Sequence, residues 1–113
     1  MTVYKKGDIV LVPFPFSDQT FIKKRPAVVI SSDVHNSHFL DIIIMAITSN
    51  LKNSIMTNEC EIKDYSSAGL LKPSIIKSAI STIDKSLVLK RLGSLSLEDS
   101  DSLNKILKEL LTL

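Results

Sequence analysis

The sequence predicts a single domain of mainly β structure, a small barrel that is followed by one C-terminal α-helix. The chain has 113 residues, which suits one hydrophobic core rather than two. Short apolar runs recur from residue 9 to residue 92, separated by Gly, Pro, Ser and Asp turn residues, as expected for a sheet of short strands. Beyond residue 102, aliphatic residues recur at three- and four-residue spacing instead, which is typical of an amphipathic helix.

The first two strands are predicted at residues 9–12 and 27–30. Both runs are apolar without alternation, which indicates strands that are covered on both faces, as in a small barrel. Pro13 and Pro15 follow the first run, and proline has no amide hydrogen to donate to a strand ladder. We therefore expect pairing between the two strands to stop or to bulge at these prolines.

Three consecutive cations, Lys23, Lys24 and Arg25, end the loop between these strands. An isolated basic run of this kind is most often a solvated turn. Pro26 singles out Arg25, because a proline restricts the residue before it to extended backbone. Arg25 is thus predicted at the junction of loop and second strand, where a cation is held in a set geometry. The only other arginine is Arg91.

The later elements follow from the same signals. The most apolar run, residues 39–47, is expected at the centre of the sheet, and it ends abruptly in Thr48, Ser49 and Asn50. The helix is predicted to begin after Ser96, a residue type that caps helix N-termini. The remaining expected elements are a short helical turn at residues 34–38 and strands at residues 55–62, 74–83 and 88–92.

Composition excludes several classes of protein. Hydrophobic residues make up 44% of the chain and charged residues 23%, as in a globular rather than a disordered protein. The formal net charge of +2 permits a nucleic-acid partner without arguing for one. No apolar run approaches the roughly 18 residues of a membrane helix, the first residues carry no signal region, and one cysteine allows no intramolecular disulfide. We therefore expect a cytoplasmic protein without a membrane segment.

Neither a metal nor a cofactor is expected. His35 and His38 are three residues apart, with Asp33 and Asp41 nearby, and this spacing can hold a metal on a helix. However, the sequence has no second cluster that would complete the coordination shell. The more common interpretation is two solvated histidines on a surface turn.

The sequence also offers no nucleophile of its own. Its three glycines are scattered, so there is no phosphate-binding glycine loop, and neither a nucleophile elbow nor an HExxH helix is present. Cys60 lies between Glu59 and Glu61, whose negative charge is expected to raise the pKa of the thiol. A reactive thiolate at Cys60 is therefore not expected.

The remaining chemistry lies in Arg25 and in the hydroxyl of Thr48. By itself, Thr48 would be interpreted as a strand-end residue that caps its own backbone. If the second and third strands are antiparallel neighbours, the start of one lies beside the end of the other, and Arg25 and Thr48 meet at one edge of the barrel. An arginine and a hydroxyl that converge at a basic rim can clamp a phosphate.

Several segments, in order, resemble the MazF/PemK family of bacterial toxins over nearly the whole chain: GDIVLVPFPFSDQTFIKKRPAVVISSD, MAITSN, STIDK, and RLGSL before a helix. The resemblance implies one SH3-like barrel domain over residues 1–113, a homodimer, and a cognate antitoxin that blocks the RNA groove. It also implies a metal-independent, sequence-selective endoribonuclease, the toxin of a type II toxin–antitoxin system. By motif match, the family's catalytic arginine and threonine fall on Arg25 and Thr48.

The expected reaction is cleavage of single-stranded mRNA by its own 2′-hydroxyl, which would leave a 2′,3′-cyclic phosphate and a 5′-hydroxyl and so inhibit translation and growth. Arg25 and Thr48 would stabilise the charge that develops on the phosphoryl oxygens, and no general base is assigned. Phe16 is most simply interpreted as a residue of the hydrophobic core, but it could instead stack on an unpaired base. The expected RNA-binding residues are Phe16, Ser17, Lys23, Lys24, Ser49, Asn50, Lys52, Ser74 and Ser81.

The chain departs from the family pattern at a few positions. Many members have a glutamate where Thr20 stands, and glutamine and arginine where Ala79 and Ser81 stand. These departures leave two alternatives open: a non-enzymatic toxin of the same fold that poisons DNA gyrase, and a cleavage-dead module that binds nucleic acid or antitoxin. The absence of any tryptophan counts against the gyrase poison, because the related poisons act through aromatic residues near the C-terminus.

Overall fold

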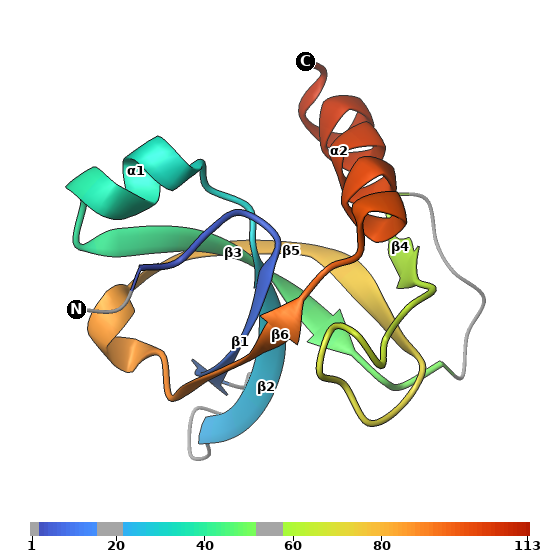
Figure 1. Ribbon diagram of the computed structural model, residues 1–113, viewed down its shortest axis with the longest axis horizontal. Helices are drawn as coiled ribbons and strands as arrows, with labels where there is room; N and C mark the ends of the chain where they lie inside the picture. The colour runs from blue at the N-terminus through green and yellow to red at the C-terminus, as the bar shows by residue number, and fades with distance from the viewer. Residues whose placement is uncertain (1–2, 16–21, 52–57) are drawn as a thin grey trace.

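The computed structural model describes residues 3–15, 22–51 and 58–113 and shows a curled antiparallel sheet followed by a C-terminal helix (Figure 1). The prediction of a mainly-β barrel with a C-terminal helix is confirmed. The strands form one sheet in the order β4-β5-β3-β2-β1-β6. The elements are β1 (Asp8–Pro15), β2 (Ile22–Val29), α1 (Asp33–His38), β3 (Asp41–Thr48), β4 (Cys60–Ile62), β5 (Ser74–Asp84), the 3₁₀ turn η1 (Lys85–Leu87), β6 (Lys90–Ser94) and α2 (Leu97–Leu111).

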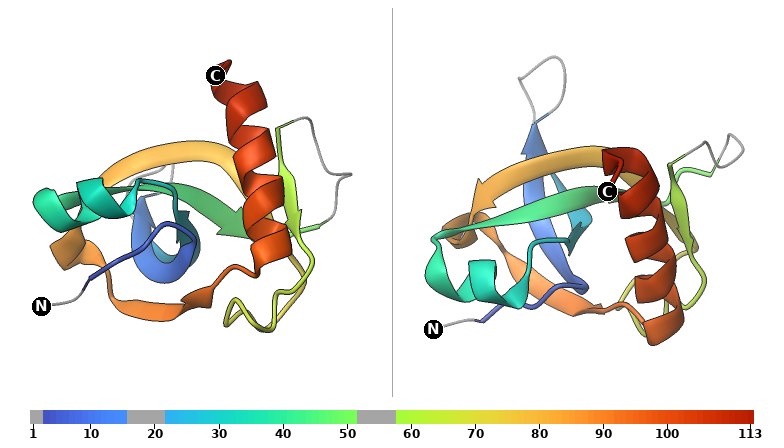
Figure 2. Two further views of the ribbon diagram at one scale, coloured as in Figure 1. Left: turned by 45° about the horizontal axis from the view of Figure 1, so that its top comes forward. Right: turned by 90° about the horizontal axis from the view of Figure 1, so that it is seen from above.

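The sheet curls so strongly that its two outer strands, β4 and β6, both lie near the start of α2 (Figures 1 and 2). Both faces of the inner strands are buried as a result. Ile9 and Val10 are consecutive residues of β1, yet both are 0% exposed and they belong to different hydrophobic clusters. The expectation of strands covered on both faces is therefore confirmed, and β3 pairs with a neighbour on each side, as expected for a central strand.

The two prolines of β1 do not interrupt its pairing with β2, which corrects the prediction of a stop or a bulge on that side, whereas its pairing with β6 ends at Leu11, before Pro13. The β1–β2 ladder continues through Pro13 and Pro15 as far as Ile22. The carbonyl of Leu11 accepts a hydrogen bond from the amide of Leu89, so Leu11 points its polar groups away from β2. Because the direction of the backbone polar groups alternates along a strand, Pro13 and Pro15 also direct theirs away from β2. The amide hydrogen that proline lacks would therefore not have taken part in the β1–β2 ladder.

Several strand boundaries differ from prediction. Strand β2 begins at Ile22, so Arg25 lies inside the strand and not at the junction of loop and strand. Strand β3 begins at Asp41 and not at Phe39 as predicted. Phe39 and Leu40 lie between α1 and β3 and are exposed. Within the described residues β4 spans only Cys60–Ile62. Strand β6 begins at Lys90 and not at residue 88 as predicted, and residues 85–87 before it form the 3₁₀ turn.

Helix α2 lies where its sequence pattern predicted. Ser96 is the N-cap, and its hydroxyl accepts a hydrogen bond from the amide of Asp99. Leu103 and Leu107 face the core and are buried. No helix in the described parts of the chain is both long and apolar enough to cross a membrane.

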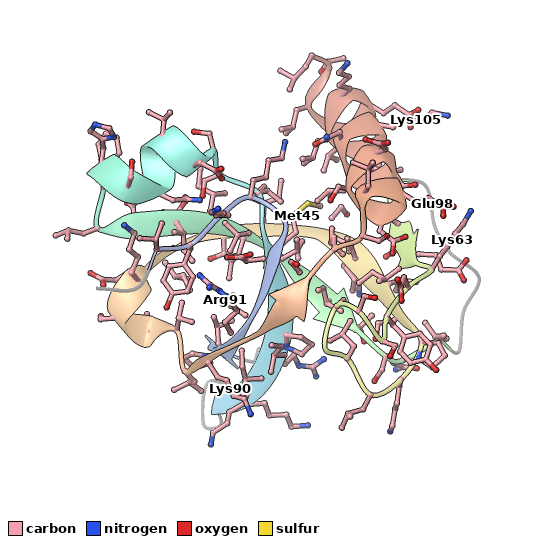
Figure 3. The ribbon with its side chains drawn as sticks, viewed as in Figure 1. Met45, Lys63, Lys90, Arg91, Glu98 and Lys105 are labelled. Atoms are coloured by element: carbon pink, nitrogen blue, oxygen red, sulfur yellow. The ribbon has the colours of Figure 1, made fainter. Side chains whose placement is uncertain are left out.

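The carboxylate of Asp99 connects the start of α2 to the end of β4. Asp99 is 1% exposed and accepts hydrogen bonds from the backbone amides of Lys63 and Asp64, each at 2.9 Å. A more exposed ion pair lies beside this connection, with 3.3 Å between Lys63 Nζ and Glu98 Oε1 (Figure 3). The buried carboxylate therefore holds the chain that leads into residues 65–73.

The arginine of β6 has a structural position. Arg91 points toward the N-terminal segment, where it forms an ion pair of 3.2 Å with Asp8 and donates a hydrogen bond to the carbonyl of Val3 (Figure 3). Its guanidinium carbon also lies 5.4 Å from the centre of the Tyr4 ring. Arg91 thus attaches residues 3–8 to the sheet.

Candidate functional site

Strands β2 and β3 separate at Pro26. Ala27 pairs with Ala46, and this is the last pair of the β2–β3 ladder, whereas β2 continues to pair with β1 as far as Ile22. Pro26 opposes Leu11, whose polar groups point away from β2, so the nitrogen of Pro26 points toward β3. A proline at this position cannot donate to β3, which is the physical reason for the ladder to end there.

A surface groove of about 460 Å³ lies where the two strands separate. Its first wall is the start of β2, with Lys23 and Lys24 exposed and Arg25 half-buried. The end of β3 contributes Thr48 and Ser49. The groove therefore brings together the basic run and the hydroxyl residues that the sequence placed in separate segments.

Arg25 and Thr48 line the groove from the two strands that separate there. If the register of Ala27 with Ala46 is continued along both strands, Arg25 comes opposite Thr48. The expectation that β2 and β3 are antiparallel neighbours is confirmed by this ladder. The Nε atom of Arg25 is buried although the residue is only half-buried, so the inner end of its guanidinium is enclosed by protein. An enclosed guanidinium has few conformations and presents a fixed charge.

The hydroxyl of Thr48 is oriented by its own backbone. Its Oγ1 accepts a hydrogen bond of 3.1 Å from the amide of Asn50, and the residue pairs with Ile75 of β5. This contact is the capping interaction that a strand-end threonine commonly makes. Because a hydroxyl that accepts in this way still has its own hydrogen to donate, Thr48 can cap the backbone and also donate to a ligand oxygen.

The other predicted binding residues divide into three groups. Ser74 lines the groove but is buried, and its hydroxyl donates to the carbonyl of Lys72 at 2.9 Å, so it supports backbone. Asn50 follows the groove residues of β3 without lining the groove, and Ser81 lies farther along β5, opposite Ile44. Their role in RNA binding stays a prediction. Three more predicted binding residues, Phe16, Ser17 and Lys52, lie outside the described residues, as does Thr20, where the chain departs from the family pattern.

Sequence reasoning missed the second wall of the groove, residues 69–72, and its aliphatic lining. The aliphatic residues Leu11, Leu70, Leu71 and Leu92 also line the groove together with Lys72, and of these Leu71 and Lys72 are exposed. Residues 64–73 lie between two predicted strands and are rich in turn residues, so they suggested no binding role. The only signal in the sequence is two leucines and a lysine between Gly69 and Pro73. This signal indicates a binding role only after the fold places these residues in the groove.

Two other candidate sites have structural partners. His35 Nε2 lies 2.9 Å from Asp41 Oδ1, and His38 Nδ1 lies 2.8 Å from the carbonyl of Val34. Across residues 3–15, 22–51 and 58–113, no three side chains of types that ligate metals gather. Burial is the largest cause that raises the pKa of the Cys60 thiol, followed by the charges of Asp99 and Glu61, whereas Lys63 lowers it; the expected upward direction is confirmed.

The comparisons with known proteins agree with this architecture. The model of the PemK-like, MazF-like toxins of type II toxin–antitoxin systems matches residues 5–111. No curated protein matches the sequence. An endoribonuclease from a mycobacterial species, solved in complex with its cognate antitoxin, superposes with a TM-score of 0.77 at 16% identity, covering 100% of this chain and 97% of that one. MazE–MazF from Deinococcus radiodurans gives a TM-score of 0.78 at 18% identity, covering 100% and 99%.

At these identities the solved structures establish the fold, whereas the family model covers nearly the whole sequence. The motifs of β1, β2 and β3 that resembled the family form adjoining strands, and all three strands contribute to the groove. The chain belongs to the PemK-like, MazF-like family of toxins of type II toxin–antitoxin systems.

Proposed function

We propose that the protein is a sequence-selective endoribonuclease toxin that cleaves single-stranded RNA without a metal ion. The observation that carries the proposal is that Arg25 and Thr48 line one groove together with Lys23 and Lys24. A flexible single strand can enter such a groove and present one phosphate to both residues. The endoribonucleases among the similar structures support the same activity.

In the proposed reaction, the 2′-hydroxyl of the substrate attacks the adjacent phosphate and expels the 5′-oxygen of the next nucleotide. The products are a 2′,3′-cyclic phosphate and a 5′-hydroxyl, so the protein supplies no nucleophile. Arg25 meets the charge on the phosphoryl oxygens with parallel N–H donors, and Thr48 donates its hydroxyl hydrogen. Arginine stays protonated in proteins, so Arg25 stabilises the developing charge and is not the base; the proton of the 2′-hydroxyl passes to water, and water protonates the departing 5′-oxygen.

The test compares wild type with Arg25→Ala, Arg25→Lys and Thr48→Val on a single-stranded RNA in the presence of a chelator. Loss of one oxyanion donor typically lowers the rate ~10²–10³-fold, and lysine is expected to rescue little because it lacks the planar fork. Lys77→Ala is the matched control, since Lys77 is an exposed cation of β5 outside the groove. Equal cleavage by wild type and Arg25→Ala would refute the assignment.

Mapping of the RNA ends tests the chemistry further. A 2′,3′-cyclic phosphate supports attack by the 2′-hydroxyl, and cleavage that needs added metal would contradict the metal-independent mechanism. Intact RNA together with trapped gyrase–DNA complexes would replace the proposal by the gyrase poison. RNA binding without cleavage would identify a cleavage-dead module.

The proposal includes two protein partners. One is a cognate antitoxin, since similar structures were solved as complexes with one, and we expect it to cover the groove. A homodimer is supported by the exposed apolar residues Ile80, Leu111 and Leu113, which border a second groove between α2 and the sheet. Light scattering at several concentrations tests the dimer, and an Ile80→Asp variant is expected to shift it toward monomer. Co-expression with a cognate antitoxin is expected to restore growth.

A further inference from the structure

The second wall of the groove carries an unusually exposed apolar side chain. Leu71 is 95% exposed, which exceeds the exposure of the other large hydrophobic residues in the described parts of the chain. A single exposed leucine is normal on a protein surface and indicates nothing by itself. Leu71 differs because it borders the groove, continues the aliphatic surface of Leu70, and precedes Lys72.

The backbone under Leu71 is held in place. Gly69 has a φ of +78°, and a Cβ at this position would lie 1.9 Å from the carbonyl oxygen of Leu92. The amide of Leu70 donates to the carbonyl of Tyr65 at 3.0 Å, and the Ser74 hydroxyl donates to the carbonyl of Lys72. Both residues that flank Leu71 are therefore held by hydrogen bonds. Leu71 is therefore presented to solvent on fixed backbone, which lowers the entropy cost of binding a ligand there.

The charges around the groove select the kind of ligand. Exposed lysines line the groove from two separate segments, with Lys23 and Lys24 in β2 and Lys72 in the segment before β5. No acidic residue lines the groove among the described residues. A ligand with a polyanionic backbone and flat apolar groups satisfies both the cations and the aliphatic residues, and single-stranded RNA has this combination.

We infer that residues 69–72 form a nucleotide subsite, in which Leu71 contacts the face of an unpaired base and Lys72 binds a phosphate that flanks the cleaved bond. The inference rests on the proposed function, because it extends the same groove beyond Arg25 and Thr48. Leu71 acts in substrate selection and not in the chemical step. Its replacement should therefore change KM and base preference while kcat stays nearly constant.

The experiment measures binding and cleavage separately. Binding is measured by fluorescence anisotropy with a single-stranded RNA whose 2′-hydroxyls are all methylated, so that it cannot be cut. Leu71→Ala is expected to weaken binding roughly 5- to 10-fold, as for the loss of one partly buried aliphatic contact. Leu71→Phe is expected to restore or strengthen it by stacking. Leu40→Ala, at a position 82% exposed and outside the groove, is the matched control and should bind as wild type does.

Lys72→Ala should weaken binding evenly across sequences and lower the slope of log affinity against log salt by about 1, whereas Lys77→Ala should not. Sequencing of cleaved ends should show relaxed preference at one fixed position in Leu71→Ala. If Leu71→Ala matches Leu40→Ala in binding, KM and cut-site preference, the subsite is overturned while the proposed nuclease stands.

Two further outcomes separate the subsite from the proposed function. If wild type binds the RNA but does not cleave an unmethylated copy, the nuclease proposal fails and the binding data alone decide the subsite. If wild type binds no RNA, both proposals are overturned.

Discussion

Replacement of Asp99 by alanine is predicted to lower the free energy of unfolding by about 3 kcal/mol, because one buried carboxylate holds two backbone amides of a distant segment. Its oxygens accept hydrogen bonds from the amides of Lys63 and Asp64 at 2.9 Å. A hydrogen bond to a charged group contributes ~1.5–3 kcal/mol. Both bonds are only partly buried and water will replace part of the loss, so we add the lower limit of that range for each.

Two further variants separate the hydrogen bonds from the charge. Asp99→Asn keeps one oxygen acceptor and sets an NH₂ group against the second amide, so about half of the loss is expected, ~1.5 kcal/mol. Asp101→Ala removes an exposed carboxylate from the same helix and controls for the charge near its N-terminus. It should change stability by less than ~0.5 kcal/mol.

Urea unfolding followed by circular dichroism at 222 nm measures these differences. For a small protein the slope is ~1–3 kcal/mol/M, so a loss of ~3 kcal/mol moves the midpoint by ~1–3 M. The reasoning is refuted if Asp99→Ala and Asp101→Ala unfold at the same urea concentration. A loss of RNA binding in Asp99→Ala at temperatures where it is folded would show that this carboxylate also positions the second wall of the groove.

Three other predictions follow from the packing. Gly69→Ala should lower the free energy of unfolding by more than ~2 kcal/mol and with it the melting temperature, because a Cβ on this left-handed backbone would collide with the Leu92 carbonyl. An unchanged melting curve would contradict this. Arg91→Ala should destabilise by ~2 kcal/mol, since it leaves the nearly buried Asp8 without its ion pair, and protease cleavage near the N-terminus should increase. Burial raises the pKa of the Cys60 thiol, so less thiolate exists at pH 7 than for a free cysteine, and Ellman's reagent should react slowly until urea is added or the pH is raised; equal rates in folded and unfolded protein would contradict this.

Much of the fold could be predicted because its signals are local. Residues 9–12 and 27–30 are apolar without interruption, and such runs favour strands that are buried on both faces. The leucine spacing and the cap at Ser96 predicted α2 correctly to its first residue. The position of Arg25 was less accurate, because the cations Lys23 and Lys24 do not look like strand residues and join β2 only through pairing with β1.

The prolines show where local rules gave the wrong answer. Pro13 and Pro15 are poor strand residues when considered alone, yet their nitrogens point away from β2 and cost the β1–β2 ladder no hydrogen bond. Pro26 has the opposite consequence, since its nitrogen points toward β3 and the ladder between β2 and β3 ends beside it. The same residue type therefore continues one ladder and ends another, and the direction of its nitrogen follows from register.

For the candidate site, the residue types were enough to select Arg25 and Thr48 as partners, because a planar cation and a hydroxyl are the donors that a phosphate requires. The second wall required the folded chain. Leu71 and Lys72 have no periodicity or motif, and they acquire a role because the curl of the sheet brings residues 69–72 into one groove with β2. Hydrophobic pattern and capping act between neighbours in sequence and can be recognised there, whereas the faces of a groove are set by strand register and by long-range contacts such as that of Asp99, which a linear pattern does not encode.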